Sequence, residues 1–168
     1  MDTRSCACKQ LVDMDLSIST RQAGRRRRTD NHGDNAMEIK RIEPEEAKEL
    51  LDSTEDYTYL DVRTAEEFEA GHVPGSINVP VMLRNPAGPG MMPNPEFLQA
   101  VETELEKDRK IITACLRGGR SLKAAHILIQ SGYENVVDMR GGYDGELDPG
   151  GNVVFPGWAR RGLPTTTD

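Results

Sequence analysis

The sequence lacks the long apolar run that a membrane-spanning helix requires. No stretch of its 168 residues approaches the roughly 18 consecutive apolar residues of such a helix, so we expect no transmembrane segment. The sequence also has few residues that could form disulfides or bind metals, because it contains only three cysteines and three histidines. Cys115 is the one cysteine outside residues 1–36, so the rest of the chain can form no internal disulfide. We therefore predict neither a metal nor another cofactor.

Basic residues are too few for a general nucleic-acid binder. The formal net charge is -7, with seven basic and five acidic residues in 1–36 but 14 basic and 23 acidic residues in 37–168. An acidic body lacks the broad basic face of proteins that bind nucleic acid. We expect neither nucleic acid nor a membrane as a partner, and any anion must be bound by local arginines and backbone amides.

Residues 1–36 have no sustained hydrophobic period, and we interpret them as a disordered extension. No apolar segment follows the four arginines at 25–28 as an export signal requires, and five aspartates argue against an organelle transit peptide. We therefore expect the protein to stay in the cytoplasm. Cys6 and Cys8 have no further cysteine or histidine nearby with which to bind a metal. Met37 opens the first organised segment, which suggests a translation start there; an intact native mass that includes residue 1 would exclude this hypothesis.

From Met37 onward, strand-like and helix-like segments alternate. The expected strands are 39–42, 57–62, 77–79, 111–114 and 135–139, and the expected helices are 45–51, 65–71, 95–107 and 120–130. Loops are expected at 81–93 and 140–164, the second held by Phe155 and Trp158. This alternation predicts an α/β fold with a parallel sheet of about five strands and helices on both faces. One domain would span 37–164, followed by a short tail, 165–168.

The segment from Cys115 to Ser121 joins an expected strand to an expected helix, at the sheet edge where ligand sites gather. Its two glycines let successive amides turn toward one anion, and the helix dipole and two arginines with no acidic neighbour in sequence add positive charge. We therefore expect the thiolate of Cys115 to be favoured and to act as a nucleophile. The alternative, a buried cysteine that only packs, leaves these glycines and arginines unexplained.

Four motifs together resemble the rhodanese family of sulfurtransferases. They are Leu60-Asp61-Val62-Arg63 with Glu66-Glu67-Phe68, then Gly71 to Pro80, then Cys115 to Ser121, then Gly141-Gly142-Tyr143 with a late Trp158. The resemblance covers about residues 38 to 164 and implies a rhodanese-like fold in which Cys115 carries sulfur as a persulfide. It also implies that the anionic sulfur species is bound by Leu116, Arg117, Gly118, Gly119, Arg120 and Ser121, with Asp61, Arg63 and His72 as mainly supporting residues.

Within this resemblance, the sequence favours thiosulfate as the sulfur donor. Arg117 and Arg120, helped by Arg84 from an acid-free loop, suit a doubly charged anion better than a mercaptopyruvate-type donor, whose family loop usually ends in Gly-Val-Thr. Because the domain has no second cysteine, the acceptor must be external, such as cyanide, a thiol or a protein, or must come from the N-terminal tail. Met82, Met91 and Met92 either cover the site or lie exposed.

Two alternatives remain open. A cysteine phosphatase or arsenate reductase of the same fold also places a thiolate before an arginine, but its loop is one residue longer than the four residues between Cys115 and Arg120. A non-catalytic binding module of this family typically lacks the cysteine. Residues 144–157 exceed the family pattern by about a dozen residues, and form either a surface loop or an access element for a partner.

Overall fold

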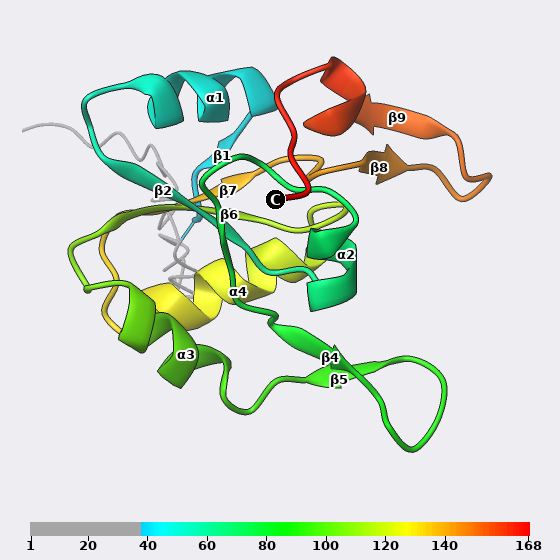
Figure 1. The fold of residues 1–168 in the computed structure, drawn as a ribbon, viewed down its shortest axis with the longest axis horizontal. Coiled ribbons are helices and arrows are strands. Elements are labelled where there is room, and N and C mark those ends of the chain that lie inside the picture. The colour runs from blue at the N-terminus through cyan, green and yellow to red at the C-terminus, as the bar shows by residue number, and fades with distance from the viewer. Residues whose placement is uncertain (1–37) are drawn as a thin grey trace, which may run out of the picture. The chain divides into compact units, whose positions relative to one another are not determined.

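The computed structural model describes residues 38–168, so the predicted disordered extension with Cys6 and Cys8 lies outside the described residues. The centre of the fold is a parallel sheet with the strand order β1-β7-β6-β2-β3 (Figure 1). Its strands are β1 (Arg41–Ile42), β2 (Tyr57–Asp61), β3 (Ile77–Asn78), β6 (Lys110–Ala114) and β7 (Val136–Met139). The prediction of a parallel sheet of about five strands is confirmed.

In residues 38–168, four α-helices and one short 3-10 helix accompany the sheet. They are α1 (Pro44–Asp52), α2 (Ala65–Glu69), α3 (Phe97–Glu104), α4 (Gly119–Gln130) and η1 (Ala159–Arg161). The capping box predicted for α2 is confirmed, since Thr64 and Glu67 bond reciprocally. The helix predicted at 95–107 is shorter at both ends. It stops because Leu105 turns extended, buries its side chain and accepts a hydrogen bond from the hydroxyl of Tyr133 at 2.9 Å.

The core lies on both faces of the sheet, because neighbouring residues of a strand point to opposite sides. On β2, Tyr59 belongs to the cluster that contains Ala47 of α1, whereas Leu60 belongs to the cluster with residues of α3 and α4. On β6, Ile112 and Ile111 divide between the same two clusters. Accordingly, α1 lies on one face and α3 and α4 on the other (Figure 1), which confirms the predicted α/β class. No helix of the described residues is both long and apolar enough to cross a bilayer.

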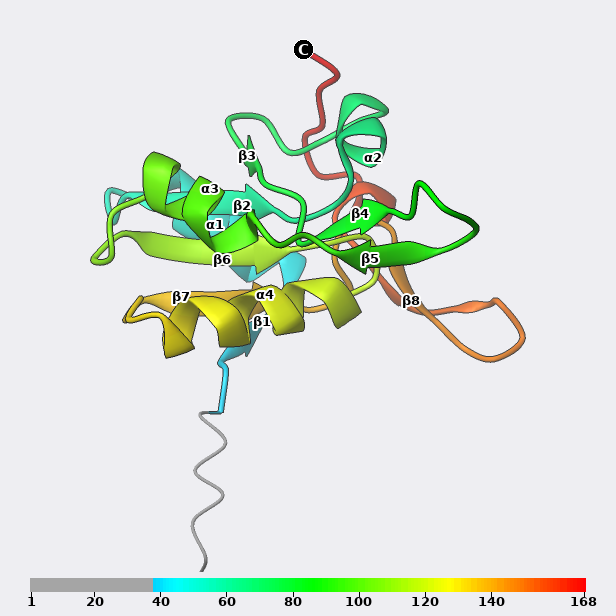
Figure 2. The ribbon, with the colours of Figure 1, turned by 90° about the horizontal axis from the view of Figure 1, so that it is seen from below.

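Two antiparallel hairpins occupy segments that the sequence presents as loops. They consist of β4 (Met82–Arg84) with β5 (Met91–Pro93), and of β8 (Gly145–Leu147) with β9 (Val153–Pro156). Gly and Pro are concentrated in the turns of both hairpins, and strands of three or four residues are too short to show the alternating pattern that identifies a strand. Both hairpins extend from the same side of the sheet, as seen in two perpendicular views (Figures 1 and 2).

Trp158 fixes the end of the chain to the sheet. Its side chain is fully buried, meets the ring of Tyr59 edge-on at 5.8 Å and donates from Nε1 to the carbonyl oxygen of Pro164 at 2.7 Å. Its backbone N–H donates to Gly142 at 2.9 Å, which closes the base of the β8–β9 hairpin. Phe155 is only partly buried, beneath the guanidinium group of Arg140.

Candidate active site

Cys115 follows the last residue of β6 and stands just before α4, with 1% of its surface exposed. Gly118 adopts a left-handed conformation, with φ of 95°, which turns its N–H toward the sulfur. The Gly118 nitrogen donates to Cys115 Sγ at 3.1 Å. Among residues 38–168, the loop amides of Leu116, Arg117, Gly119 and Arg120 donate no hydrogen bond. The loop can therefore donate several N–H groups to an anion bound at the sulfur.

The back of this loop is held by the segment after β7. The carbonyl oxygen of Cys115 accepts from Tyr143 N at 2.7 Å, and that of Leu116 accepts from Asp144 N at 2.9 Å. Gly142, with φ of 60°, packs so closely that a Cβ there would overlap the carbonyl group of Cys115. These bonds turn both carbonyl oxygens away from the front of the loop, which leaves the amides to face a ligand.

Arg120 is not the free cation that the sequence suggests. Its Nη1 and Nη2 donate to the two carboxylate oxygens of Glu67 at 2.6 and 2.8 Å, across 53 residues of sequence. Burial would raise the pKa of Glu67, but hydrogen bonds from Arg120 and the Thr64 N–H, with the charges of Arg120 and Arg63, outweigh it and lower the pKa to about 2. Arg120 has no acidic neighbour in sequence, but the fold brings Glu67 to it from α2, so its charge is already paired.

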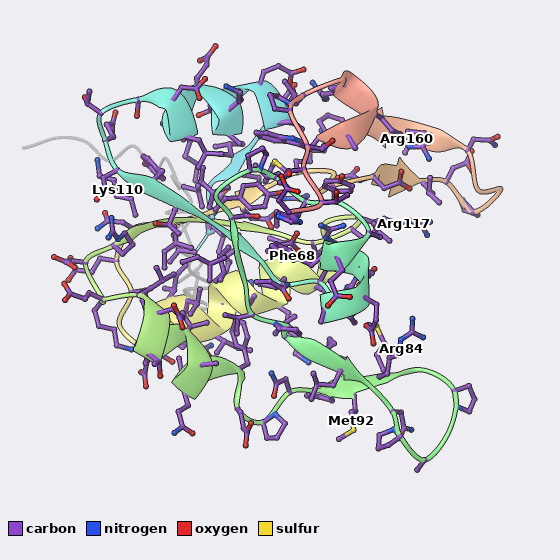
Figure 3. The ribbon with its side chains drawn as sticks, in the orientation of Figure 1. Phe68, Arg84, Met92, Lys110, Arg117 and Arg160 are labelled. Carbon is purple, nitrogen blue, oxygen red and sulfur yellow. The ribbon has the colours of Figure 1, made fainter. Side chains whose placement is uncertain are left out.

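Arg117 and Ser121 differ in their exposure to solvent. Arg117 is exposed, and Figure 3 shows it at the side of the molecule from which the hairpins extend. No carboxylate among the described residues lies within ion-pair distance of it. Ser121 is fully buried and donates to the carbonyl oxygen of Gly118 at 3.2 Å, which braces the loop from below. Arg84 also points outward, with 74% of its side chain exposed, and its contact with Glu66 is 3.8 Å long.

Asp61 and Arg63 form a buried ion pair beneath the site, with side chains 1% and 2% exposed. Arg63 Nη2 donates to Asp61 Oδ2 at 2.6 Å and to the carbonyl oxygen of Gly71 at 2.8 Å, while Nη1 donates to that of Glu67 at 3.0 Å. The guanidinium group also stacks over the ring of Tyr143 at 4.1 Å. Arg63 thus ties α2, the following turn and the segment behind the Cys115 loop together.

His72 lies outside the immediate surroundings of the sulfur. Its ring stacks on Phe68 at 3.7 Å between centroids, and its Nδ1 lies 3.0 Å from the carbonyl oxygen of Phe68. Its backbone pairs with Thr166, two residues past the expected domain end, through bonds of 2.9 and 2.8 Å. These contacts fix a turn and the chain end.

A second buried carboxylate supports the loop from β7. Asp138 is fully buried and accepts from Arg41 Nε at 2.9 Å, while its Oδ1 has no partner among the described residues. Burial raises the pKa of Asp138, although the guanidinium group of Arg41 opposes the shift. Arg41 in turn lies against Gly118, since a Cβ there would meet its Nη2 at 3.0 Å.

Sequence reasoning missed Glu67, Gly142, Arg41 and Asp138 as neighbours of the loop. The capping box revealed Glu67 only as a helix residue, and nothing local pairs Arg41 with Asp138, which are brought together by strand register. Within the described part of the chain, no group of three or more His, Cys, Asp or Glu side chains is arranged to hold a metal ion.

Known proteins with related sequences include two from Arabidopsis thaliana. The chain is 43% identical over 109 residues to thiosulfate sulfurtransferase 16, chloroplastic, covering 65% of this chain and 79% of that protein. It is 35% identical over 144 residues to the mitochondrial protein HIGH ARSENIC CONTENT 1, covering 82% of this chain and 84% of that protein. Among solved structures, a rhodanese-related protein from Thermoplasma volcanium is 28% identical with a TM-score of 0.54, covering 77% of this chain and all of that one.

The names of these relatives contradict the predicted cytoplasmic location. Both Arabidopsis proteins are named for organelles, one chloroplastic and one mitochondrial. Five aspartates in residues 1–36 were the reason for excluding a transit peptide, but the same segment holds six arginines, and transit peptides are rich in arginine. Acid content alone was too weak a criterion, and the cytoplasmic prediction is wrong.

Family, fold and site agree with one another. Residues 43–146 match the rhodanese-like domain family, and this span contains β2, the Cys115 loop and the segment that holds the loop from behind. The TM-score of 0.54 with the rhodanese-related structure supports the same α/β fold around this parallel sheet. The chain therefore belongs to the rhodanese family of sulfurtransferases.

Proposed function

We propose that this protein is a thiosulfate sulfurtransferase in which Cys115 carries the transferred sulfur as a persulfide. The observation that carries the proposal is the bond from Gly118 N to Cys115 Sγ at 3.1 Å, at the centre of a loop whose other amides have no acceptor among residues 38–168. A persulfide or a bound thiosulfate extends the sulfur outward and gives these amides an anion to bind. The proposed catalytic domain spans residues 37–164.

The reaction proceeds as two displacements at sulfur. The Cys115 thiolate attacks the outer sulfur of thiosulfate, the S–S bond of the donor breaks, and sulfite leaves with the bonding electron pair. The persulfide anion then remains on Cys115, stabilised by the loop amides. An acceptor such as cyanide attacks the outer sulfur, forms thiocyanate and returns the Cys115 thiolate.

Thiosulfate fits the positive charge at this site. Arg117 is exposed at the front of the loop, and Arg120 adds a second guanidinium, although its pair with Glu67 reduces its net charge. Relatives named thiosulfate sulfurtransferase at 43% and 40% identity support the same donor. Arg84 has a smaller part in this proposal, because 74% of its side chain is exposed to solvent on β4.

Arsenate reduction is the second candidate, because one relative bears the name HIGH ARSENIC CONTENT 1. It would use the same thiolate, with arsenate in place of thiosulfate at the amides. The four residues between Cys115 and Arg120 form a shorter loop than that of cysteine phosphatases, which favours an outer sulfur atom over a phosphate or arsenate group beside the thiolate.

An intact-mass measurement tests the proposal. We expect incubation with thiosulfate alone to add one sulfur atom, about 32 Da, to the wild-type chain and nothing at this site in Cys115→Ser. Cyanide is expected to remove the added mass. Failure to gain sulfur, together with arsenate reduction that requires Cys115, would move the protein to the second candidate. Silence in both assays would favour a binding module.

A further inference from the structure

The exposed apolar side chains of this protein are concentrated on its two hairpins. Among the described residues, five large hydrophobic side chains are exposed: Leu83, Met91 and Met92 on β4–β5, and Val153 and Val154 on β8–β9. Val154 has the largest exposed fraction, 61%. None of the five belongs to either core cluster, so they are not needed to hold the sheet and its helices together. Isolated exposed apolar residues are ordinary, but their confinement to two hairpins marks an interaction surface.

Both hairpins lie at the end of the sheet where the Cys115 loop is found. In two perpendicular views they extend past the carboxyl edge of the sheet, on the side where β6 passes into α4 (Figures 1 and 2). Met92 and Arg117 project on that side, whereas Lys110, at the start of β6, lies at the opposite end (Figure 3). The β8–β9 hairpin is also joined directly to the Cys115 loop, since the backbone N–H of Asp144, just before β8, donates to the carbonyl oxygen of Leu116.

Each hairpin has only two strands, so each leaves strand edges with unpaired backbone groups. An extended peptide can pair with such an edge and place alternate side chains against apolar neighbours. The charge near the sulfur adds a second requirement. Arg117 is exposed without an ion-pair partner among residues 38–168, and the β4–β5 hairpin contains no acidic residue. A matching segment therefore carries aliphatic side chains and a carboxylate.

We propose that the two hairpins dock an acceptor protein, which presents the accepting thiol on an extended segment with aliphatic side chains and a carboxylate next to its cysteine. This inference rests on the proposed function, because it assigns the acceptor of the Cys115 persulfide. Cys115 is 1% exposed, so the accepting thiol must be guided close to the loop, which a segment bound on the hairpins achieves. In transfer, the acceptor thiolate attacks the outer persulfide sulfur, becomes a persulfide itself and restores the Cys115 thiolate.

The test uses the full-length protein and a synthetic peptide of about ten residues, long enough to extend about 33 Å. The peptide has one cysteine, an adjacent aspartate, and valine or leucine at alternate positions on both sides. A second peptide replaces every aliphatic residue by serine, and a third replaces the aspartate by lysine. We expect the sulfur of thiosulfate-loaded protein to pass to the first peptide about tenfold faster than to either of the others, as burial of a few methyl groups and one charge pair predicts.

Hairpin variants assign the preference to the surface. Met92→Gln with Val154→Thr replaces two apolar side chains by polar ones of similar size, and Met92→Leu with Val154→Ile is the matched apolar control. We expect the Met92→Gln, Val154→Thr variant to lose most of the rate preference for the first peptide, and the Met92→Leu, Val154→Ile variant to keep it. Discharge to cyanide is expected to be equal in all three proteins, because cyanide is too small to contact the hairpins. Equal peptide rates in the polar pair and the wild type would overturn the docking surface and leave the persulfide mechanism standing.

A binding measurement separates the two proposals further. A fluorescent form of the first peptide, with serine in place of cysteine, is titrated with unloaded protein and followed by anisotropy. We expect the peptide to bind the wild-type protein and to bind the Met92→Gln, Val154→Thr variant more weakly. This result should not depend on whether thiosulfate can load Cys115. A second copy of this chain is the alternative occupant of the hairpins, and light scattering tests for it. A wild-type dimer that becomes a monomer in the Met92→Gln, Val154→Thr variant would show that a second copy covers the hairpins, and it would overturn the acceptor assignment.

Discussion

Glu67 and Arg120 face each other as a two-pronged ion pair, with Arg120 Nη1 and Nη2 at 2.6 and 2.8 Å from the two carboxylate oxygens. Arg120 is the second residue of α4, directly after the loop that holds Cys115, and Glu67 lies in the first turn of α2. The pair thus fixes the direction of one loop arginine from a separate helix. A bidentate bond restrains the planar guanidinium group more firmly than a single contact would.

The first prediction concerns donor binding. In Glu67→Gln the side chain keeps an oxygen for the Thr64 N–H but loses the charge that holds Arg120. We expect the KM for thiosulfate to rise about tenfold, the equivalent of one charge-assisted hydrogen bond, with a smaller change in kcat. The matched control is Glu69→Gln, on the exposed side of the same helix. An unchanged KM in Glu67→Gln would mean that Arg120 needs no anchor.

The same residue predicts an acid-dependent loss of stability. The pKa of Glu67 is about 2 in the folded protein, against 4.5 for the unperturbed group. A lowered pKa stabilises the folded state fully above about pH 4.5, and this contribution disappears as the pH falls toward 2. It is on the order of 2 to 3 kcal/mol, so urea unfolding curves of the wild type and Glu67→Gln should converge as the pH is lowered through this range. If the difference in unfolding free energy between the two proteins stays constant as the pH falls, the ion pair of Glu67 and Arg120 does not contribute this stability.

Gly142 is predicted to be essential for the conformation of the Cys115 loop. A Cβ at this position overlaps the carbonyl group of Cys115, so Gly142→Ala must displace the loop. We expect loss of persulfide formation and a decrease of several kcal/mol in the free energy of unfolding. Gly75→Ala is the matched control, because Gly75 also has a positive φ, 75°, but nothing within 4 Å of the added Cβ. It should cost only about 1 kcal/mol of backbone strain and retain sulfur loading.

The buried pair of Asp61 and Arg63 is predicted to dominate stability near the site. Asp61→Ala removes a carboxylate that is 1% exposed and leaves the buried charge of Arg63 without its partner. Breaking such a pair costs about 3 to 5 kcal/mol, measurable as a lower urea midpoint. Asp52→Ala, which breaks the exposed pair with Lys48, should cost less than about 1 kcal/mol. Equal effects of the two substitutions would refute the assigned role.

The central part of the fold follows from local patterns in the sequence. The apolar run before Cys115 and the capping box at Thr64 depend on neighbouring residues alone, and both predicted elements are present. The position of the Cys115 loop between a strand and a helix was also predictable, because its cysteine, glycines and arginines are contiguous. Its anchors were not, since Glu67 and Arg120 are 53 residues apart and no periodicity links them. The hairpins were missed because their strands are only three or four residues long, and the Gly and Pro of the connections between them indicated loops.

The insertion of residues 144–157 is closed at its base. Trp158 N donates to the Gly142 carbonyl and Ala159 N to that of Tyr143, both at 2.9 Å, so the two ends of the segment are already adjacent before the hairpin begins. The chain therefore leaves and re-enters the domain at one point, and a change in hairpin length adds little entropy cost of loop closure. This makes the tip a natural graft site: a recognition peptide inserted between β8 and β9 would bring a chosen thiol donor or acceptor to the sulfur loop without redesign of the domain.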